Sequence, residues 1–520
     1  MLRLPDRKRI RSSAPAFLAL VVASAVARAL LVGAPSLSDE SVHLLGSWTL
    51  MDGGRLYVDF VDNKPPLLYA AFAAPQAVLG RGIGAVRLLA FLLVVPLTGL
   101  AASAILGHGR RGRWAAVLYV LFSASYLPED ALPVHTELLM LLPAGWAMAL
   151  VARGGPTAGP LRAVASGVLL GLAALVKPTA LLWLAALPVA ELRRREGTGR
   201  MAAAMRIAVA ALAGVAVPLA ATALVFARRG DIPELAEWTV FFNVRYAGAA
   251  IDPGEVALRA IRALLPWLTA TGVLWWAYAR GHRDHRADAP WALIDVLVLC
   301  SVPAVLVGWR FFGHYFLQAL FPLCLGAAPQ AARLSARPWT RAAKIAGSVV
   351  ALTVVGFGAA NAWLLHARED VIEETFPLHR EVAAFLEADP CRAGASLFVW
   401  GIAPRLYVAT GIGPASRFVL PQETISGYRP GRRDPDRSTV REAHRALLLS
   451  ELRDHGATYI LDLAPSGYHR WEAFPLTSFP ELYALVRERY EIAGVVSGVV
   501  VHRLGGCVDN VGTRHRSEDG

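Results

Sequence analysis

Long apolar stretches recur along this 520-residue chain from residue 14 to residue 366, and they constrain the fold more than any other feature. Hydrophobic residues make up 55% of the sequence and charged residues only 18%, against roughly 25% charged residues in an ordinary soluble domain. In lipid, only helices and closed barrels satisfy every backbone polar group. The sequence therefore predicts a polytopic α-helical membrane protein.

About eleven helical spans are predicted. Some are shorter than the roughly 20 residues that a span needs, so the sequence does not define sharply where these spans begin and end. The apolar segment 67–80 is predicted to be an interfacial helix, because a crossing there would reverse the sides of all later loops. The first apolar stretch, 15–35, follows a basic start and has the pattern of a signal peptide, but the many later spans favour a retained signal anchor. The expected spans are 14–34, 85–107, 114–128, 137–152, 162–177, 178–191, 203–227, 261–279, 290–308, 314–330 and 345–366.

The loops between these spans alternate in charge, which predicts the orientation. With the N-terminus inside, arginines cluster in the inner loops, whereas the outer loops hold carboxylates such as Asp52, Asp59, Glu129 and Asp130. This is the positive-inside pattern, and it accounts for the net charge of +12 without nucleic-acid binding. An odd number of spans then places residues after 366 outside the cytoplasm. We expect a multi-pass protein of the cytoplasmic (inner) membrane.

The composition changes at about residue 367. Segments 397–401, 417–420, 457–463 and 494–502 are predicted strands, and 438–455 and 479–488 are predicted helices. This alternation predicts an extracytoplasmic α/β domain over 367–507, after a membrane-embedded domain over 1–366 and before a disordered tail at 508–520. Cys391 and Cys507 lie in the polar C-terminal region and form either a disulfide or two free thiols.

Charged residues at the ends of spans are the first candidates for a site. Asp39 and Glu40 directly follow the first span, and Asp62 and Lys64 close the same loop. Charges at the edge of a span are costly unless they meet water, lipid headgroups or a substrate. One interpretation is a solvated helix end. The other is a carboxylate that faces a lipid-anchored substrate, with the lysine against a phosphate.

Later loops add a second set of candidates. Glu137 begins an apolar span and is either a helix N-terminal carboxylate or a support for the first acid. Lys177 interrupts an apolar run, so it either snorkels to the interface or binds a phosphate. His314 and Tyr315 belong to an interfacial aromatic belt or contact a phosphate. Arg245 is a weaker candidate in the loop 229–260.

The order of these motifs resembles the GT-C integral membrane glycosyltransferases. The closest group is the bacterial protein O-mannosyltransferase-like and aminoarabinose-transferase-like set (family 39-like). The resemblance covers about residues 14–330, and more loosely the C-terminal stretch V-W-G-x-x-P-x-L-Y. The motifs that carry it are D-E after the first span, D-x-x-D-N-K-P-P-L, G-x-G-x-x-R-L, H-T-E-L, V-K-P-T-A and G-H-Y-F-L-Q-A-L-F-P.

This resemblance implies a polyprenyl-phosphate-linked sugar donor and transfer on the outer face of the membrane. The family's general base or acceptor-positioning acid falls on Asp39, with Glu40 as the neighbouring alternative. Residues near the donor phosphate fall on Lys64, Lys177 and Tyr315, with His314 beside them. The second acid falls on Glu137. His135 stands where relatives often have asparagine, so acceptor contacts are expected to differ.

The chemistry that this implies is a single displacement. A carboxylate takes the proton of an acceptor hydroxyl, and cationic side chains hold the charge of the departing polyprenyl phosphate. No cofactor is required and no metal-ligand spacing such as C-x-x-C is present; the use of a divalent metal stays open. The acceptor is a lipid, a glycan or a protein, and membrane lipid is the surrounding partner.

Two other functions fit a chain with many spans. A transporter or lipid flippase would carry midplane charges and inverted repeats, and no repeat is evident here. A surface-polysaccharide ligase or polymerase would also use lipid-linked glycans, with a larger outer loop.

Overall fold

The structure is a computed structural model, and it describes residues 7–29, 32–126, 130, 133–152, 159–195, 197–248, 252–285, 289–337, 339–367, 376–429 and 435–507. Glu129 and the predicted tail 508–520 lie outside these residues. The chain divides into two compact units. The first comprises residues 1–34, 64–249 and 253–365, and the second comprises residues 35–63, 250–252 and 366–520.

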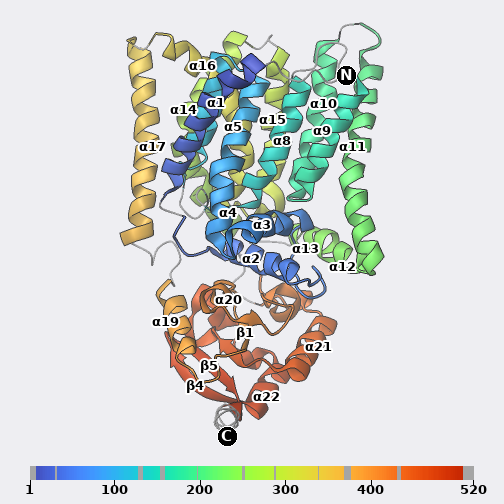
Figure 1. Ribbon diagram of the computed structural model, residues 1–520, viewed down its shortest axis with the longest axis vertical. Coiled ribbons are helices and arrows are strands. Elements are labelled where there is room, and N and C mark those ends of the chain that lie inside the picture. Colours follow the sequence, from blue (N-terminus) through green and yellow to red (C-terminus); the bar gives the residue numbers. More distant parts are fainter. Residues whose placement is uncertain are drawn as a thin grey trace. The chain divides into compact units, whose positions relative to one another are not determined.

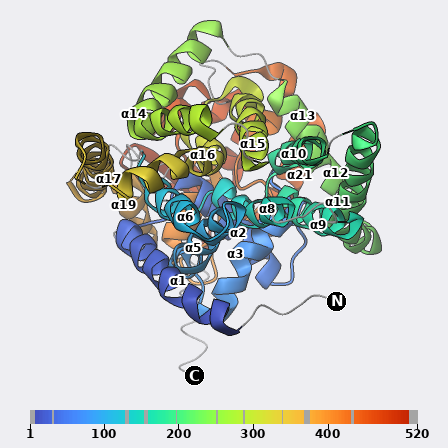
Figure 2. The same cartoon turned by 90° about the horizontal axis from the view of Figure 1, so that it is seen from above.

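The first unit is a helical bundle (Figures 1 and 2). Each of the eleven apolar segments is helical over most of its described length, although residues 178–185 form a 3-10 helix instead of an α-helix. The segment predicted as an interfacial helix is helical as well. The main helices of the first unit are α1 (Arg7–Arg28), α3 (Pro66–Leu79), α4 (Ile83–Leu89), α5 (Val95–Ile105), α6 (Arg110–Phe122), α8 (Thr136–Ala152), α9 (Pro160–Ala174), α10 (Ala186–Arg194), α11 (Arg200–Arg229), α14 (Pro253–His285), α15 (Ala289–Leu306), α16 (Leu317–Ser335) and α17 (Arg341–Ala367).

Length and composition alone qualify five described helical stretches to cross a membrane. They are Ile83–Ile105, Arg200–Arg229, Pro253–Asp284, Pro290–Trp309 and Arg341–Leu364. Four shorter apolar helices accompany them: Pro15–Arg28, Pro66–Leu79, Thr136–Ala152 and Pro160–Ala174. The structure therefore bears out a mostly helical, strongly apolar protein, while the number eleven stays a prediction.

Small residues let helices α9 and α11 pack backbone to backbone. Gly167 and Gly171 lie one turn apart on α9, in the G-x-x-x-G spacing that suits close helix pairs in membranes. A Cβ atom on Gly167 would lie 2.0 Å from the carbonyl oxygen of Ala211 on α11. A larger residue at position 167 would therefore push the two helices apart. Both figures show the two helices side by side.

The second unit contains a five-stranded mixed sheet in the order β2-β1-β3-β5-β4. Strand β1 pairs in parallel with β2 and β3, and β5 pairs antiparallel with β3 and β4. The strands are β1 (Ser396–Trp400), β2 (Gly413–Pro414), β3 (Tyr459–Asp462), β4 (Tyr490–Val496) and β5 (Val499–Leu504); the helices α2 (Ser38–Met51), α19 (Phe376–Glu387), α20 (Arg405–Thr410), α21 (Glu442–Glu451) and α22 (Pro480–Arg489) belong to the same unit.

Two of the four strand predictions are confirmed, and two need correction. The segment 417–420 is not a strand, because side chains bind its backbone instead of a neighbouring strand: Glu451 accepts from the N–H of Arg417, and Ser416 accepts from the N–H of Phe418. The segment 494–502 is a hairpin and not one strand. Ser497 and Gly498 both adopt positive φ and form the two-residue turn between β4 and β5.

Residues 35–63 belong to the second unit, where they bond to residues far from them in the sequence. The N–H of Val61 donates to the carbonyl oxygen of Arg417 at 3.2 Å. The buried Arg405 guanidinium donates from Nε to the carbonyl oxygen of Ser36 at 2.5 Å. This unit is therefore assembled from segments that lie far apart in the chain.

Cys391 and Cys507 form a disulfide, which settles one alternative left by the sequence. Their Cα atoms are 6.1 Å apart, and the bridge closes a loop with a sequence separation of 116. It ties the end of the last strand to the segment before β1. The two remaining cysteines, Cys300 and Cys324, are free thiols in the helical unit.

Candidate functional site

Two lysine–proline turns lie next to each other in the helical unit. Lys64 precedes two prolines that begin α3, and Lys177 precedes the proline that begins the 3-10 helix Pro178–Ala185. Proline suits the first helical position because its missing N–H is not needed there. The N–H of Leu67 donates to the carbonyl oxygen of Leu175 at 3.1 Å, so the backbones of these two motifs are bonded together.

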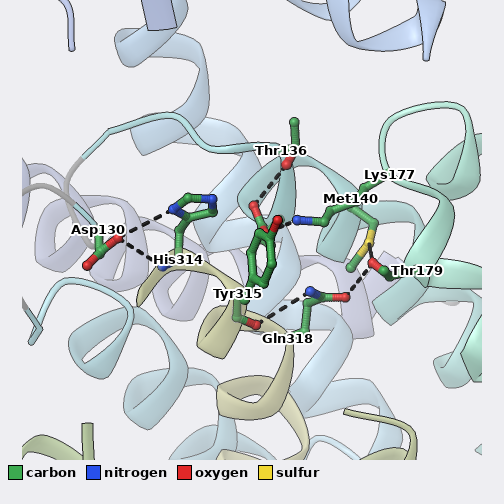
Figure 3. Close-up of polar contacts among 9 residues, drawn as sticks. Asp130, Thr136, Met140, Lys177, Thr179, His314, Tyr315 and Gln318 are labelled. Carbon is green, nitrogen blue, oxygen red and sulfur yellow. Dashed lines mark hydrogen bonds and ion pairs between the residues drawn. The ribbon is translucent and has the colours of Figure 1, made fainter. Parts of the chain in front are cut away.

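Lys177 forms an ion pair with Glu137. The glutamate is in the first turn of α8 and its side chain is fully buried, whereas that of the lysine is 13% exposed. The hydroxyl of Thr136 donates to the second carboxylate oxygen at 2.9 Å (Figure 3). Removing one member of a buried ion pair leaves an uncompensated charge, so the two side chains hold each other in place.

Tyr315 is a second neighbour of this ammonium group. Lys177 Nζ lies 4.0 Å from the centre of the tyrosine ring, which is cation–π geometry. Below the ring, the side chain of Gln318 donates to the carbonyl oxygen of Tyr315 at 3.4 Å and accepts from Thr179 at 2.6 Å (Figure 3). The lysine therefore sits between a carboxylate and an aromatic face.

His314 lies in a stack of rings beside this ion pair. Its ring is parallel to that of His135, with centroids 4.2 Å apart, and to that of Phe312 at 5.6 Å. Asp130 accepts a hydrogen bond from the backbone N–H of His314 at 3.0 Å. Asp130, His135, Thr179 and Gln318 were not among the predicted site residues. An acidic outer loop and the motif H-T-E-L were the only signals for the first two.

The segment that carries His314 and Tyr315 has an unusual backbone. Gly308, Trp309 and Phe311 all have positive φ, which is costly for bulky residues and is found where the surroundings enforce it. Arg310 is 2% exposed and places its guanidinium 4.5 Å from the centre of the Tyr246 ring. The connection from α15 to α16 is thus held in a specific, strained shape.

Three predicted residues belong to the second unit. Asp39 is exposed in the first turn of α2, whereas Glu40 is fully buried and accepts a hydrogen bond from the N–H of Leu37 at 3.1 Å. Asp62 is half-buried. Burial raises the pKa of Tyr57 well above its usual value, and the negative charge of Asp62 adds to this shift.

The structure thus brings Glu137, Lys177, His314 and Tyr315 together in the helical unit, and Lys64 lies in the motif bonded to the Lys177 turn. Arg245 pairs instead with Glu237 of its own loop at 2.6 Å. This cluster offers a lysine ammonium, imidazole groups and a phenol in one place, and such groups bind phosphate oxygens well.

Comparison with solved structures identifies the fold. ArnT from Cupriavidus metallidurans bound to undecaprenyl phosphate aligns with a TM-score of 0.56 and 13% identity, over 94% of this chain and 97% of ArnT. Its apo form gives a TM-score of 0.53 and 14% identity, over 94% of this chain and 98% of ArnT. The oligosaccharyltransferase AglB from Archaeoglobus fulgidus, in complex with an inhibitory peptide and a dolichol-phosphate, gives a TM-score of 0.51 and 10% identity, over 96% of this chain and 75% of AglB.

At these identities the likeness shows the fold alone: the chain shares the fold of ArnT and AglB, which agrees with the fold expected from its motifs. No family model matches the chain, and no curated protein sequence matches it.

Proposed function

We propose that this protein is a membrane glycosyltransferase that moves a sugar from a polyprenyl-phosphate donor to an acceptor hydroxyl on the outer face of the cytoplasmic membrane. The observation that carries the proposal is Lys177, held between the Glu137 carboxylate and the Tyr315 ring. A cation in an apolar bundle is a functional candidate by default. The fold neighbours that carry undecaprenyl phosphate or a dolichol-phosphate support a lipid phosphate as its ligand.

The donor phosphate would bind Lys177, Lys64, Tyr315 and His314. An ammonium group has three N–H donors, so a lysine paired with one carboxylate can also serve a phosphate oxygen. These groups would hold the negative charge that the polyprenyl phosphate gains as the bond to the sugar breaks. Charge-assisted contacts are the strong ones for this purpose.

Asp39 would take the proton of the acceptor hydroxyl. Its neighbour Glu40 is a weaker candidate because its buried carboxylate already accepts from the N–H of Leu37, at the start of α2. Asp39 is exposed and lies on the same turn. Glu137 would support the site by fixing Lys177, while Asp62 and Arg245 remain candidate supporting residues.

We further propose about eleven spans, with the unit that holds the sheet outside the cytoplasm. The Cys391–Cys507 disulfide supports this side, because disulfides persist in oxidising compartments and are rare in the cytosol. The arginine-rich alternate loops support the same orientation.

The test is transfer by the full-length protein reconstituted in liposomes. A panel of radiolabelled hexosyl and pentosyl undecaprenyl phosphates would be offered with membrane extracts as acceptor. We expect release of undecaprenyl phosphate and labelled product from at least one donor, and much less of both at the same donor concentration with Lys177→Ala protein. Movement of intact donor across the bilayer without cleavage would instead support a flippase and overturn the proposal.

A further inference from the structure

Asp130, which was not among the predicted site residues, lies directly against the backbone of His314. Asp130 Oδ1 accepts from the N–H of His314 at 3.0 Å and lies 3.4 Å from Nδ1 of the same residue (Figure 3). Each side chain is only 14% exposed. The two residues are 184 positions apart in the sequence, so tertiary structure has brought this carboxylate to the ring.

Gly313 makes this approach possible. A Cβ atom at position 313 would lie 2.0 Å from Asp130 Oδ2 and 2.7 Å from Cε1 of Tyr126. Tyr126 is itself fixed, because its hydroxyl donates to the carbonyl oxygen of Ala263 at 2.9 Å and its ring packs edge-to-face on Trp267. The carboxylate therefore occupies space that any other residue at position 313 would fill.

We propose that Asp130 is a positioning residue for His314. This proposal rests on the proposed function. The carboxylate accepts from the backbone and from Nδ1–H of the imidazole, which fixes the ring and leaves the proton on Nδ1. In the charged ring, Nε2–H on the opposite edge is then the group that donates to an oxygen of the donor phosphate. Outer groups that orient a histidine and raise its basicity are a common device in protein sites.

The charges that the helical unit itself places around His314 give the sign of the pH effect. Asp130 and Glu137 are negative and favour the imidazolium, whereas His135 and the more distant Lys177 oppose it when charged. Phosphate binding through a charged His314 is lost as pH rises and the ring loses its proton. Replacing Asp130 with asparagine removes one of the negative charges that favour the imidazolium, so the loss of binding begins at lower pH.

Two measurements on the full-length protein test this relation. The first is binding of undecaprenyl phosphate from pH 5.5 to 8.5. The second is modification of His314 by diethyl pyrocarbonate, read by peptide mass spectrometry over the same range, because this reagent attacks the neutral imidazole whether or not the protein is a glycosyltransferase. We expect Asp130→Asn to move both midpoints down by about one pH unit, the lower end for loss of a nearby opposite charge.

Gly313→Ala is the independent variant, since it displaces the carboxylate without removing it. It should move the His314 midpoint in the same direction, and the double variant Asp130→Ala/Gly313→Ala should shift it no further than Asp130→Ala alone. His314→Gln should abolish the pH-dependent limb of binding. An unchanged His314 midpoint in Asp130→Asn overturns the positioning role.

The two measurements also separate this proposal from the proposed function. A shifted modification midpoint in a protein that binds no undecaprenyl phosphate keeps the Asp130–His314 relation, and refutes a donor-phosphate role for it. A normal binding curve together with an unshifted His314 modification midpoint in Asp130→Asn has the opposite meaning. It refutes the positioning role of Asp130 and leaves donor binding in place.

Discussion

The ammonium group of Lys177 lies 4.0 Å above the centre of the Tyr315 ring, and it also pairs with the buried carboxylate of Glu137. Residues from three separate parts of the chain thus fix one positive charge inside an apolar bundle. A charge so constrained cannot follow a ligand far, so it favours a ligand that arrives in one place and one orientation. A phosphate carried by a membrane lipid meets that requirement.

Replacing Lys177 with alanine should weaken use of the donor by about ten- to a hundredfold, because a hydrogen bond to a charged group contributes about 1.5–3 kcal/mol. The measurement is a donor titration of transfer by the purified protein. Lys64→Ala should show the same kind of loss. Lys344→Ala is the matched control, since that lysine is exposed on α17 and contacts Trp339. Titration curves that stay unchanged in both site variants would remove phosphate binding as the role of these lysines.

Glu137→Gln should lower the stability of the protein more than the small change in side-chain size suggests. The amide keeps the shape but removes the charge that compensates a nearly buried ammonium, and breaking one side of such a pair costs about 3–5 kcal/mol. Thermal unfolding in detergent is the measurement. The double variant Glu137→Gln/Lys177→Met should recover part of the loss because no charge is left unpaired. A double variant less stable than both single variants would contradict this account.

Asp39→Asn should keep the fold and lose about 10²–10⁴-fold in transfer, the usual contribution of general-base help. Glu40→Gln should behave in the opposite way, with lower stability and retained turnover, because its carboxylate bonds the N–H of Leu37 at the start of α2. Transfer and thermal unfolding are measured on the same preparations. If the Glu40→Gln protein is inactive while the Asp39→Asn protein turns over normally, the catalytic carboxylate is Glu40. If both are active, this loop is not the catalytic loop.

The Cys391–Cys507 bridge should add substantially to stability, because it constrains a long loop of the unfolded chain. In the chain-entropy description, a loop of this length contributes about 4–5 kcal/mol. The double variant Cys391→Ser/Cys507→Ser should therefore unfold at a lower temperature than the natural protein. Alkylation of the unreduced natural protein should modify neither cysteine, and labelling of both would refute the bridge.

Acidification should destabilise the unit that holds the sheet through His502. Burial lowers the pKa of this residue below its usual value of 6.5, so the unfolded chain binds its proton more readily than the folded one. Its effect on stability is absent well above pH 6.5 and grows as pH falls through 6.5 toward the folded pKa. Thermal unfolding at pH 7.5 and 5.5 should show a smaller difference in His502→Gln than in the natural protein. An equal difference in the two proteins would exclude His502 as the source of the acid sensitivity.

The sequence predicted the helical nature of the first 366 residues and four members of the cluster, since each was a polar residue beside a long apolar run. It could not predict Asp130 against His314, because that contact joins positions 184 residues apart and depends on an absent side chain at Gly313. Two of the four strand predictions failed for a related reason. At Arg417, a distant glutamate decides where the backbone bonds, and at Ser497 a two-residue turn divides what composition presents as one strand.

The second unit is built mainly from residues 35–63 and from residues after 365, with most of the helical bundle encoded between them. A ribosome adds about 5–20 residues per second, so roughly a quarter of a minute to a minute separates the synthesis of the two parts. During that interval Val61 and Ser36 have no Arg417 or Arg405 to bond. A nascent chain cut anywhere before the C-terminal segment therefore lacks the residues that Val61 and Ser36 bond in the complete unit, so α2 and its flanks cannot reach their final packing.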